Sequence, residues 1–351
     1  MSTLNVEAIS HPTSGSLVTI NGTAPSNRNK IINGDMRIDQ RNAGASVTYA
    51  GRVYTADRFS CEKSDLSTLV ATNQQVFDGP PGFDKSIKTT ITTAQSSTSN
   101  SKIVGCDQRI EGYNWADMAF GTASAKSFTM SFWVKSSVTG TYPVSFFNAG
   151  VNRAYLATYS ISAANTWEYK TITVTGDTTG TWNTTNGIGL GFQMSLGGGS
   201  STEGTAGSWE STYKSRTSAC VNLNETLNAT WQITGVQLEV GSVATPFEHR
   251  SYGDELARCQ RYYQLFDSAA GEAYPTGGVG AYAICGVNFI QTMRAAPTVI
   301  LGTAGTSSNI SGDNFTLTTP TAIGCVYRVV QGAGGGNYYQ QRTSNTASAE
   351  L

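Results

Sequence analysis

Alternating apolar and polar residues along the middle of the chain predict β-strands. The segment FTMSFWVKS (128–136) places its apolar residues, from Phe128 to Val134, on one face and Trp133 on the other. The same alternation recurs in WEYKTITVTG (167–176), GIGLGFQMSLGG (187–198) and WQITGVQLEVG (231–241). Strands at this spacing with Gly-rich turns are typical of an antiparallel sandwich, which we expect over residues 30–250, with residues 195–215 as a long surface loop.

The segments on either side of this region differ from it. Residues 1–29 are polar and contain the hairpin signal Asn21-Gly22, so they form either a loose terminus or a segment that orders against a partner. Residues 251–266 (SYGDELARCQRYYQLF) predict a short helix, which Ser251 and Asp254 cap at its start. Steps of four and three residues separate its apolar positions Tyr252, Leu256, Cys259, Tyr263 and Phe266. This spacing is consistent with a short oligomer neck or with a helix packed on its own sandwich.

A second, smaller β domain is predicted over residues 267–351. Its candidate strands are residues 280–289, 297–302, 314–320 and 322–332. We read GAGGGNYYQQR (332–342) as a Gly-rich loop that displays Tyr338 and Tyr339. The fold class is therefore all-β, with a sandwich, a short helix and a small C-terminal β domain.

The low charge of the chain limits the classes of partner that it could bind. Charged residues make up 13% of the sequence and the net charge is −1, so no basic surface for nucleic acid is expected. The sequence contains no apolar run of about 20 residues, so we expect no membrane insertion, and its start shows no secretory signal pattern. Buried reduced thiols are the expected state of Cys61, Cys106, Cys220, Cys259, Cys285 and Cys325, although Cys285 and Cys325 could form a bridge on neighbouring strands.

Groups that could carry out catalysis are sparse. Histidine is the usual general base, and the chain has only His11, in the polar N-terminal segment, and His249, in a linker. A glycosidase would need two carboxylates about 5–10 Å apart, and the candidates cluster around the long loop at Glu203, Glu210 and Glu225. We therefore expect no enzyme activity, no cofactor and no bound metal, with glycan cleavage as the alternative.

Aromatic residues are the best candidates for a binding surface, because flat rings stack on the apolar faces of sugars. Trp133 lies on the polar face of its strand, and Trp182 and Trp209 lie in polar segments. Each of them could instead be a structural anchor. In the C-terminal domain the candidates are Tyr274, Tyr338 and Tyr339, and we expect this domain to contact cells.

Three segments resemble parts of a known group of proteins. IINGDMRIDQRNAG (31–44), followed by YTADRF (54–59), resembles the opening of sandwich domains in tail-fibre proteins of marine and other environmental phages. WQITGVQLEVGSVATPFEHRSYGDELARCQRYYQ (231–264) resembles the closing segment of the same domains and is the most specific match. TMRAAPTVIL (292–301), together with the Ala-Glu-Leu terminus, resembles their C-terminal modules.

This resemblance implies a jelly-roll sandwich similar to carbohydrate-binding modules, assembled as a homotrimer. It also implies that residues 1–29 attach to tail or baseplate proteins of the virion and that the chain binds a bacterial surface polysaccharide or lipopolysaccharide. One feature departs from such sandwiches: many hold calcium through carboxylates on the last strand, whereas Ile233-Thr234-Gly235-Val236 has none. We expect a tail-fibre subunit that is made in the host cytoplasm and located in the virion. The alternatives are a glycan-cleaving spike, and a head fibre, decoration protein or purely structural tail protein.

Overall fold

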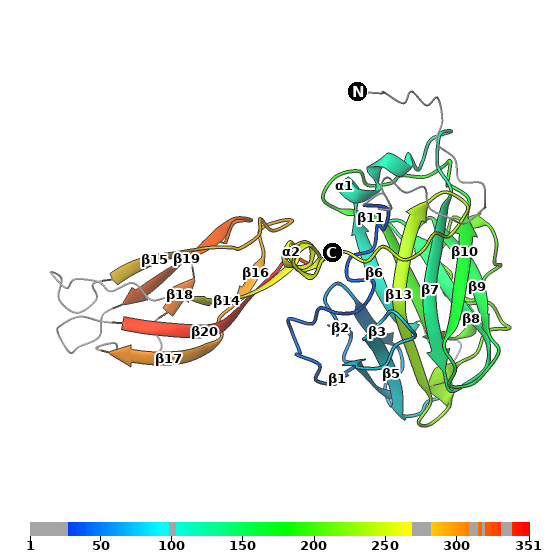
Figure 1. The fold of residues 1–351 in the computed structure, drawn as a ribbon, viewed down its shortest axis with the longest axis horizontal. Coiled ribbons are helices and arrows are strands. Elements are labelled where there is room, and N and C mark those ends of the chain that lie inside the picture. The colour runs from blue at the N-terminus through cyan, green and yellow to red at the C-terminus, as the bar shows by residue number, and fades with distance from the viewer. Residues whose placement is uncertain (1–26, 98–102, 269–281, 309–314, 318–319, 331–338) are drawn as a thin grey trace, which may run out of the picture. The chain divides into compact units, whose positions relative to one another are not determined.

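The structure, a computed structural model, describes residues 27–97, 103–268, 282–308, 315–317, 320–330 and 339–351. The chain divides into two compact units, Met1–Arg250 together with Leu351, and Ser251–Glu350. The first contains strands β1 to β13, and the second contains helix α2 and strands β14 to β20 (Figure 1). The predicted all-β architecture, with a sandwich, a short helix and a small C-terminal β region, is confirmed. No helix in the described ranges is long and apolar enough to cross a membrane.

Two antiparallel sheets form the sandwich. The first sheet has the strand order β1-β4-β5-β13-β7-β10, and the second has the order β12-β9-β8-β11-β6-β3-β2. The strands of the first sheet are β1 (Val47–Thr48), β4 (Val70–Val76), β5 (Ser86–Thr93), β13 (Thr230–Val240), β7 (Phe128–Ser136) and β10 (Glu168–Val174). Those of the second are β12 (Trp209–Glu210), β9 (Ala154–Ile161), β8 (Gly140–Phe147), β11 (Ile188–Gly197), β6 (Ile103–Glu111), β3 (Ser60–Ser64) and β2 (Arg52–Tyr54).

Short helical turns connect some of these strands. They are α1 (Gly112–Trp115), η1 (Ala116–Met118), η2 (Ser200–Thr202) and η3 (Leu223–Glu225). The predicted long loop 195–215 therefore contains the end of β11, η2 and the short edge strand β12. Because β12 pairs with β9, with Trp209 opposite Tyr155, part of this loop belongs to the second sheet.

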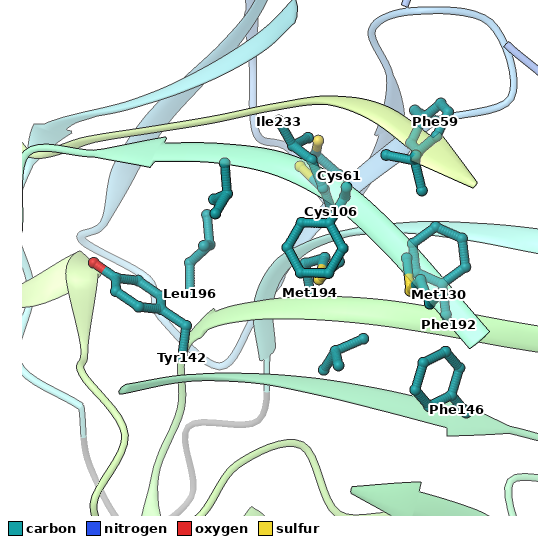
Figure 2. Packing of buried hydrophobic residues seen from close by; sticks show 14 of the residues in the cluster. Phe59, Cys61, Cys106, Met130, Tyr142, Phe146, Phe192, Met194, Leu196 and Ile233 are labelled. Atoms are coloured by element: carbon teal, nitrogen blue, oxygen red, sulfur yellow. The ribbon is translucent and has the colours of Figure 1, made fainter. Parts of the chain in front are cut away.

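The core lies between the two sheets, as the alternation predicted. Phe128, Met130, Phe132 and Val134 are all buried, and they face side chains such as Phe146, Phe192 and Met194 from the second sheet (Figure 2). The alternate positions of β10 behave in the same way, because Ile172 and Val174 are buried while Tyr169 is exposed. Residues of β11 are buried on both faces, since even Gln193 and Ser195 are covered.

The buried cysteines agree with the expectation of reduced thiols. Cys61 and Cys106 are opposite each other on β3 and β6, and the Asn73 amide donates to both sulfurs. Burial raises the pKa of the Cys61 thiol, which keeps it protonated. Cys220, Cys259 and Cys325 are also buried thiols outside any disulfide. The strands of the possible Cys285–Cys325 bridge are neighbours, but Cys285 is opposite Tyr327 and Cys325 is opposite Val287.

The second unit contains two small sheets. One has the order β14-β20-β16, with β17 also paired to β20, and the other has the order β15-β19-β18. Their strands are β14 (Tyr263–Ser268), β15 (Tyr282–Asn288), β16 (Thr298–Ile300), β17 (Thr303–Ser308), β18 (Phe315–Leu317), β19 (Gly324–Val330) and β20 (Tyr339–Ser348). Four of these strands lie within the predicted segments. Strand β20 replaces the end of the predicted Gly-rich loop, because it pairs with β14, β16 and β17.

The predicted helix is real but shorter than expected. Helix α2 spans Tyr252–Gln260, and the Ser251 hydroxyl accepts the Asp254 N–H at 3.2 Å, as the capping pattern predicted. The extension to residue 266 was wrong, because Tyr263 and Phe266 belong to β14, which pairs along its length with β20. The predicted helical seam is therefore not continuous, and Tyr252 at its start is 55% exposed. Tertiary pairing overrides the local helical spacing here.

Candidate functional site

Two aromatic side chains are opposite each other on the outer face of the first sheet. Trp133 on β7 pairs in register with Tyr169 on the edge strand β10, and their ring centroids are 5.3 Å apart. Both point away from the core because Phe132 and Val134 alternate with Trp133 and fill the inner face. Tyr169 is 44% exposed and Trp133 is half-buried, so these rings face solvent. Figure 1 shows β13, β7 and β10 side by side in this sheet.

A β-bulge in β13 provides the floor beside these rings. The register shifts between Thr234 and Gln237, and Gly235 adopts a left-handed conformation with a φ of +61°. A Cβ atom at Gly235 would lie 2.8 Å from the Phe83 ring and 3.1 Å from the Trp133 ring. The two rings therefore approach the backbone more closely than any residue with a side chain would allow.

The turn that follows β13 forms one wall. The Phe247 ring packs edge-on against Phe83 at 5.0 Å, and His249 lies 5.3 Å from Phe83 and 4.9 Å from Phe247. Buried polar side chains of β13 hold this turn in place. Glu239 accepts the Thr245 N–H at 2.8 Å, and the Gln237 side chain accepts the Glu248 N–H at 2.8 Å.

Glu248 ties the same turn to the start of the described chain. Its carboxylate accepts the backbone N–H groups of Asn27 at 2.6 Å and Asn29 at 2.7 Å. Burial opposes ionisation of Glu248, but these bonds and the nearby Arg250 outweigh it and lower the pKa of the carboxyl. The wall is thus anchored at both ends, which keeps the aromatic rings in a fixed arrangement.

Together these residues enclose a groove of about 430 Å³. Its lining is mostly apolar and aromatic, and its side-chain hydrogen-bonding groups are those of Ser131 and His249, the Trp133 indole and the Tyr169 hydroxyl. The described lining residues are Pro81, Gly82, Phe83, Ser131, Trp133, Tyr169, Gly235, Pro246, Phe247 and His249. A few polar groups among aromatic walls are the usual composition of a small-molecule site. A cavity of about 500 Å³ has Lys63–Ser67 as its lining among the described residues, and none of these five has an aromatic ring.

A smaller polar pocket of about 110 Å³ adjoins the groove, and the two share Gly82, Phe83 and His249. Its other lining residues are Asp35, Arg37 and Asp84. Asp35 is buried and forms an ion pair with the Arg37 guanidinium, whose Nη2 also donates to the Arg250 carbonyl at 2.9 Å. The groove therefore has an apolar centre and one charged, hydrogen-bonding end.

The other two predicted tryptophans lie elsewhere and serve the packing of the sandwich. Trp182 is only 8% exposed, and its ring packs at 4.8 Å from Phe120 and 5.4 Å from Trp209. Their indole N–H groups donate to backbone carbonyls, Trp182 to Thr179 at 3.1 Å and Trp209 to Thr175 at 2.7 Å. This arrangement favours the alternative of structural anchors for Trp182 and Trp209.

The tyrosines expected to bind in the C-terminal domain are not placed by the structure. Tyr274 and Tyr338 lie outside the described residues, and so does His11. Tyr339 begins β20, but its side chain is also outside the description.

The carboxylates in and after the long loop all have partners. Glu203 is 3.4 Å from Arg216, Glu210 accepts the Thr205 N–H at 3.3 Å, and Glu225 accepts the Ser97 N–H at 3.0 Å. Within the described ranges no group of three or more His, Cys, Asp or Glu residues could hold a metal ion.

Sequence reasoning found Trp133 but missed its neighbours in the groove. Tyr169 had a signal, since its alternation with Ile172 and Val174 placed it on the outer face of a strand. Phe83, Phe247 and His249 had none, because they come from loops whose path over the sheet depends on the bulge at Gly235 and on Gln237 and Glu239.

No protein-family model matches the chain, and no curated protein matches it. Solved structures with a similar fold include the enzymatically active domain of tailspike protein 4 from bacteriophage CBA120, with 12% identity and a TM-score of 0.33. That match covers 61% of this chain and 21% of the tailspike chain, so this chain spans about a fifth of its length.

Two carbohydrate-binding modules are also similar. A family 4 module has 15% identity and a TM-score of 0.29 over 60% of this chain and 98% of the module. The family 11 module of Clostridium thermocellum, solved with a β-1,3-1,4-mixed-linked tetrasaccharide, has 10% identity and a TM-score of 0.28 over 55% and 96%. At this level of similarity, the function of this chain has to be argued from its own residues.

Proposed function

We propose that this chain is a phage tail-fibre subunit that binds bacterial surface glycans through the aromatic groove on its sandwich. One observation carries the proposal: aromatic side chains from four segments converge on the outer face of a sheet. The neighbouring outward positions are also polar: Thr171 is exposed, and Ser131 is covered but lines the groove. Packing of the core does not require Trp133 and Tyr169 to face outward, and a clustered apolar patch on a polar surface commonly marks a binding site.

The chemistry of the groove suits a sugar. The flat faces of Trp133 and Tyr169 can stack on the C–H face of a pyranose ring, while Ser131 and His249 can hydrogen-bond to its hydroxyls. The volume of the groove, about 430 Å³, lies within the range of roughly 300–1,000 Å³ that small-ligand sites occupy. The glycine bulge and the anchored turn hold the rings in position before a ligand arrives, which reduces the entropy lost on binding.

The role in a fibre is supported by the resemblance of residues 231–264 to the closing segment of tail-fibre sandwiches. In this proposal residues 1–29 attach to the virion, and three copies assemble into one fibre. Several modest sites on one particle then bind far more tightly than a single site, so weak affinity in each groove suffices. A head fibre or decoration protein with the same groove is the second candidate, and labelling of the N-terminus on intact virions distinguishes the two.

The proposed role is binding rather than cleavage. Among the described residues, the lining of the central groove contains no carboxylate, and Asp35 of the adjoining polar pocket is buried in an ion pair with Arg37. Glycoside hydrolysis uses a pair of carboxylates that flank the scissile bond. Glu203, Glu210 and Glu225 have partners of their own that account for their positions. Incubation of host polysaccharide with the protein is expected to release no new reducing ends, and their appearance would favour a glycan-cleaving spike.

A glycan array tests the binding proposal with two matched variants. Trp133→Ala removes the central ring of the groove, and Tyr113→Ala removes a ring on α1 that is 61% exposed and does not line the groove. Removing one stacked ring is expected to weaken binding by at least about tenfold, which corresponds to about 1.4 kcal/mol. Tyr113→Ala is expected to bind like the wild type. Equal binding by wild type and Trp133→Ala would contradict the proposal.

A further inference from the structure

We infer that the groove continues along β7 into a second sugar subsite formed by Trp167, Lys135 and Asp78, and that its ligand is a neutral oligosaccharide of at least two units. This inference rests on the proposed function and extends it. It assigns a ligand class to the site, namely an uncharged glycan chain rather than a single sugar or an acidic polymer.

The position of the second subsite follows from strand geometry. Trp133 and Lys135 are two residues apart on β7, so they share the outer face about 6.6–6.8 Å from each other. On the β10 side, Tyr169 and Trp167 show the same two-residue spacing. The loop between β4 and β5 contributes to both sites, because it places Phe83 in the groove and Asp78 beside Lys135. The two sites are thus about one sugar unit apart on one surface.

The second subsite is held together by direct contacts. The Lys135 ammonium lies 2.6 Å from an Asp78 oxygen and 4.8 Å from the centre of the Trp167 ring. The Trp167 indole N–H donates to the other Asp78 oxygen at 3.4 Å. Burial opposes ionisation of Asp78, but hydrogen bonds from Lys135, Trp167 and Gln232 outweigh it and lower the pKa of the carboxyl. The carboxylate is therefore a fixed, charged acceptor.

Exposure shows which atoms a ligand can reach. The Asp78 side chain is 43% exposed, whereas that of Lys135 is 15% exposed. A carboxylate that keeps accessible surface can accept hydrogen bonds from two neighbouring sugar hydroxyls, and Lys135 can donate to a third oxygen. Ion pairs near the surface stabilise a protein by only about 0–1 kcal/mol, so stability alone is a weak reason for this cluster.

The charges along the surface favour an uncharged ligand. Asp78 and Lys135 offset each other, and among the described residues the lining of the central groove contains no Lys, Arg, Asp or Glu. At its other end, the polar pocket has two carboxylates, Asp35 and Asp84, against the single guanidinium of Arg37. An acidic sugar would therefore meet no unpaired cation among these lining residues and would be repelled at one end.

The test uses oligomers of glucose, mannose and galactose, from monosaccharide to hexasaccharide, alongside uronic-acid and sialic-acid oligomers of matched length. Binding to the full-length protein is measured by titration calorimetry. For the wild type, affinity is expected to rise by at least about tenfold from one unit to two or three, with little dependence on salt. Trp167→Ala and the double variant Asp78→Asn/Lys135→Met are expected to remove this gain and to leave affinity for the monosaccharide unchanged.

A matched control lies on β10, the strand that begins directly after Trp167. Lys170→Met removes the 2.6 Å ion pair between Lys170 and Glu168. Both residues alternate with Tyr169 along β10, so their side chains lie on the same face as Ile172, away from the groove. This control is expected to retain the full gain with length. Circular dichroism melting checks that all variants are folded.

Three outcomes overturn the inference. The first is a Trp167→Ala variant that keeps the gain with length, the second is a uniform loss at all lengths, and the third is a preference for the acidic oligomers. If any of these occurs while Trp133→Ala still weakens binding as predicted, the proposed glycan groove stands and only the second subsite fails. If the wild type binds no oligomer on this panel or on the array, the groove proposal and this inference both fail.

Discussion

Two aromatic groups in the sandwich look alike in sequence and differ in structure. In the groove, Trp133 and Tyr169 lie 5.3 Å apart, and near β12 Trp182 and Trp209 lie 5.4 Å apart. Trp182 is 8% exposed, whereas Tyr169 is 44% exposed. In the Trp182–Trp209 group, backbone carbonyls already accept both indole N–H groups. The comparison teaches that a polar neighbourhood in sequence does not reveal exposure, whereas the outward position of Tyr169 on the edge strand β10 leaves its ring accessible.

The difference arises from how each segment is held. The stretch before Trp182 folds back on the sandwich because Asp177 receives two bonds of 2.7 Å from Arg153 and further bonds from Thr179. The groove rings instead rest on the open backbone of Gly235 and are flanked by a turn. The Trp182–Trp209 group thus contributes to stability, and the Trp133–Tyr169 group is available for binding.

The largest expected effect is on the stability of the buried group. Trp182→Ala should lower the free energy of unfolding by about 3–5 kcal/mol, because it leaves a cavity between Phe120 and Trp209. Chemical denaturation measures this loss, with Trp133→Ala as the matched variant and an expected cost below about 2 kcal/mol. Equal losses in the two variants would remove the distinction between the groups.

A second prediction concerns the floor of the groove. Gly235→Ala should cost about 2–4 kcal/mol of stability, because it combines left-handed backbone strain with a clash against Phe83 and Trp133. It should also weaken glycan binding by at least about tenfold, since one of the rings must move. Thermal unfolding and the glycan array measure the two effects.

Gly51→Ala provides the control for this prediction. Gly51 has a φ of +70°, and nothing lies within 4 Å of the added Cβ. The Gly51→Ala variant therefore introduces left-handed backbone strain without a side-chain clash. We expect it to cost about 1–2 kcal/mol of stability and to leave glycan binding unchanged. Full glycan binding by Gly235→Ala would show that the close approach of the rings is not needed.

The smallest expected effect is a pH dependence in the Trp182 segment. Burial opposes ionisation of Asp177, but bonds from Arg153 and Thr179 outweigh it and lower the pKa of the carboxyl. Its contribution is therefore fully present above the unfolded-state pKa of about 3.9 and is lost as the pH falls through the lower folded-state value. Asp177→Asn should cost about 1–2 kcal/mol at neutral pH and show a smaller loss of stability below about pH 4. Denaturation midpoints across this range measure it, and identical pH profiles for wild type and variant would contradict it.

Local patterns predicted those parts of the fold in which one strand face is buried. Strand β7 spans the predicted residues 128–136, and β10, β11 and β13 lie within one residue of their predicted segments or inside them. Local sequence patterns failed where pairing between strands far apart in the sequence determined the structure. The helical spacing at Tyr263 and Phe266 gave way to pairing of β14 with β20, and the polar strand β20 has little apolar alternation to reveal it.

The candidate site was only partly predictable for the same reason. Alternation placed Trp133 and Tyr169 on the outer face, but Phe83 and Phe247 reach them through loops separated by more than 150 residues in sequence. The tryptophans in polar segments were misleading, because hydrogen bonds to Thr179 and Thr175 let their indoles pack inward.

The most direct test of the central claim is a crystal structure of the protein with the neutral oligosaccharide that binds it best. The account predicts one sugar ring stacked on Trp133 within the groove bounded by Phe83 and Phe247, and a second beside Trp167 and Asp78. A ligand bound only near Trp182 and Trp209, or only in the C-terminal unit, would contradict it.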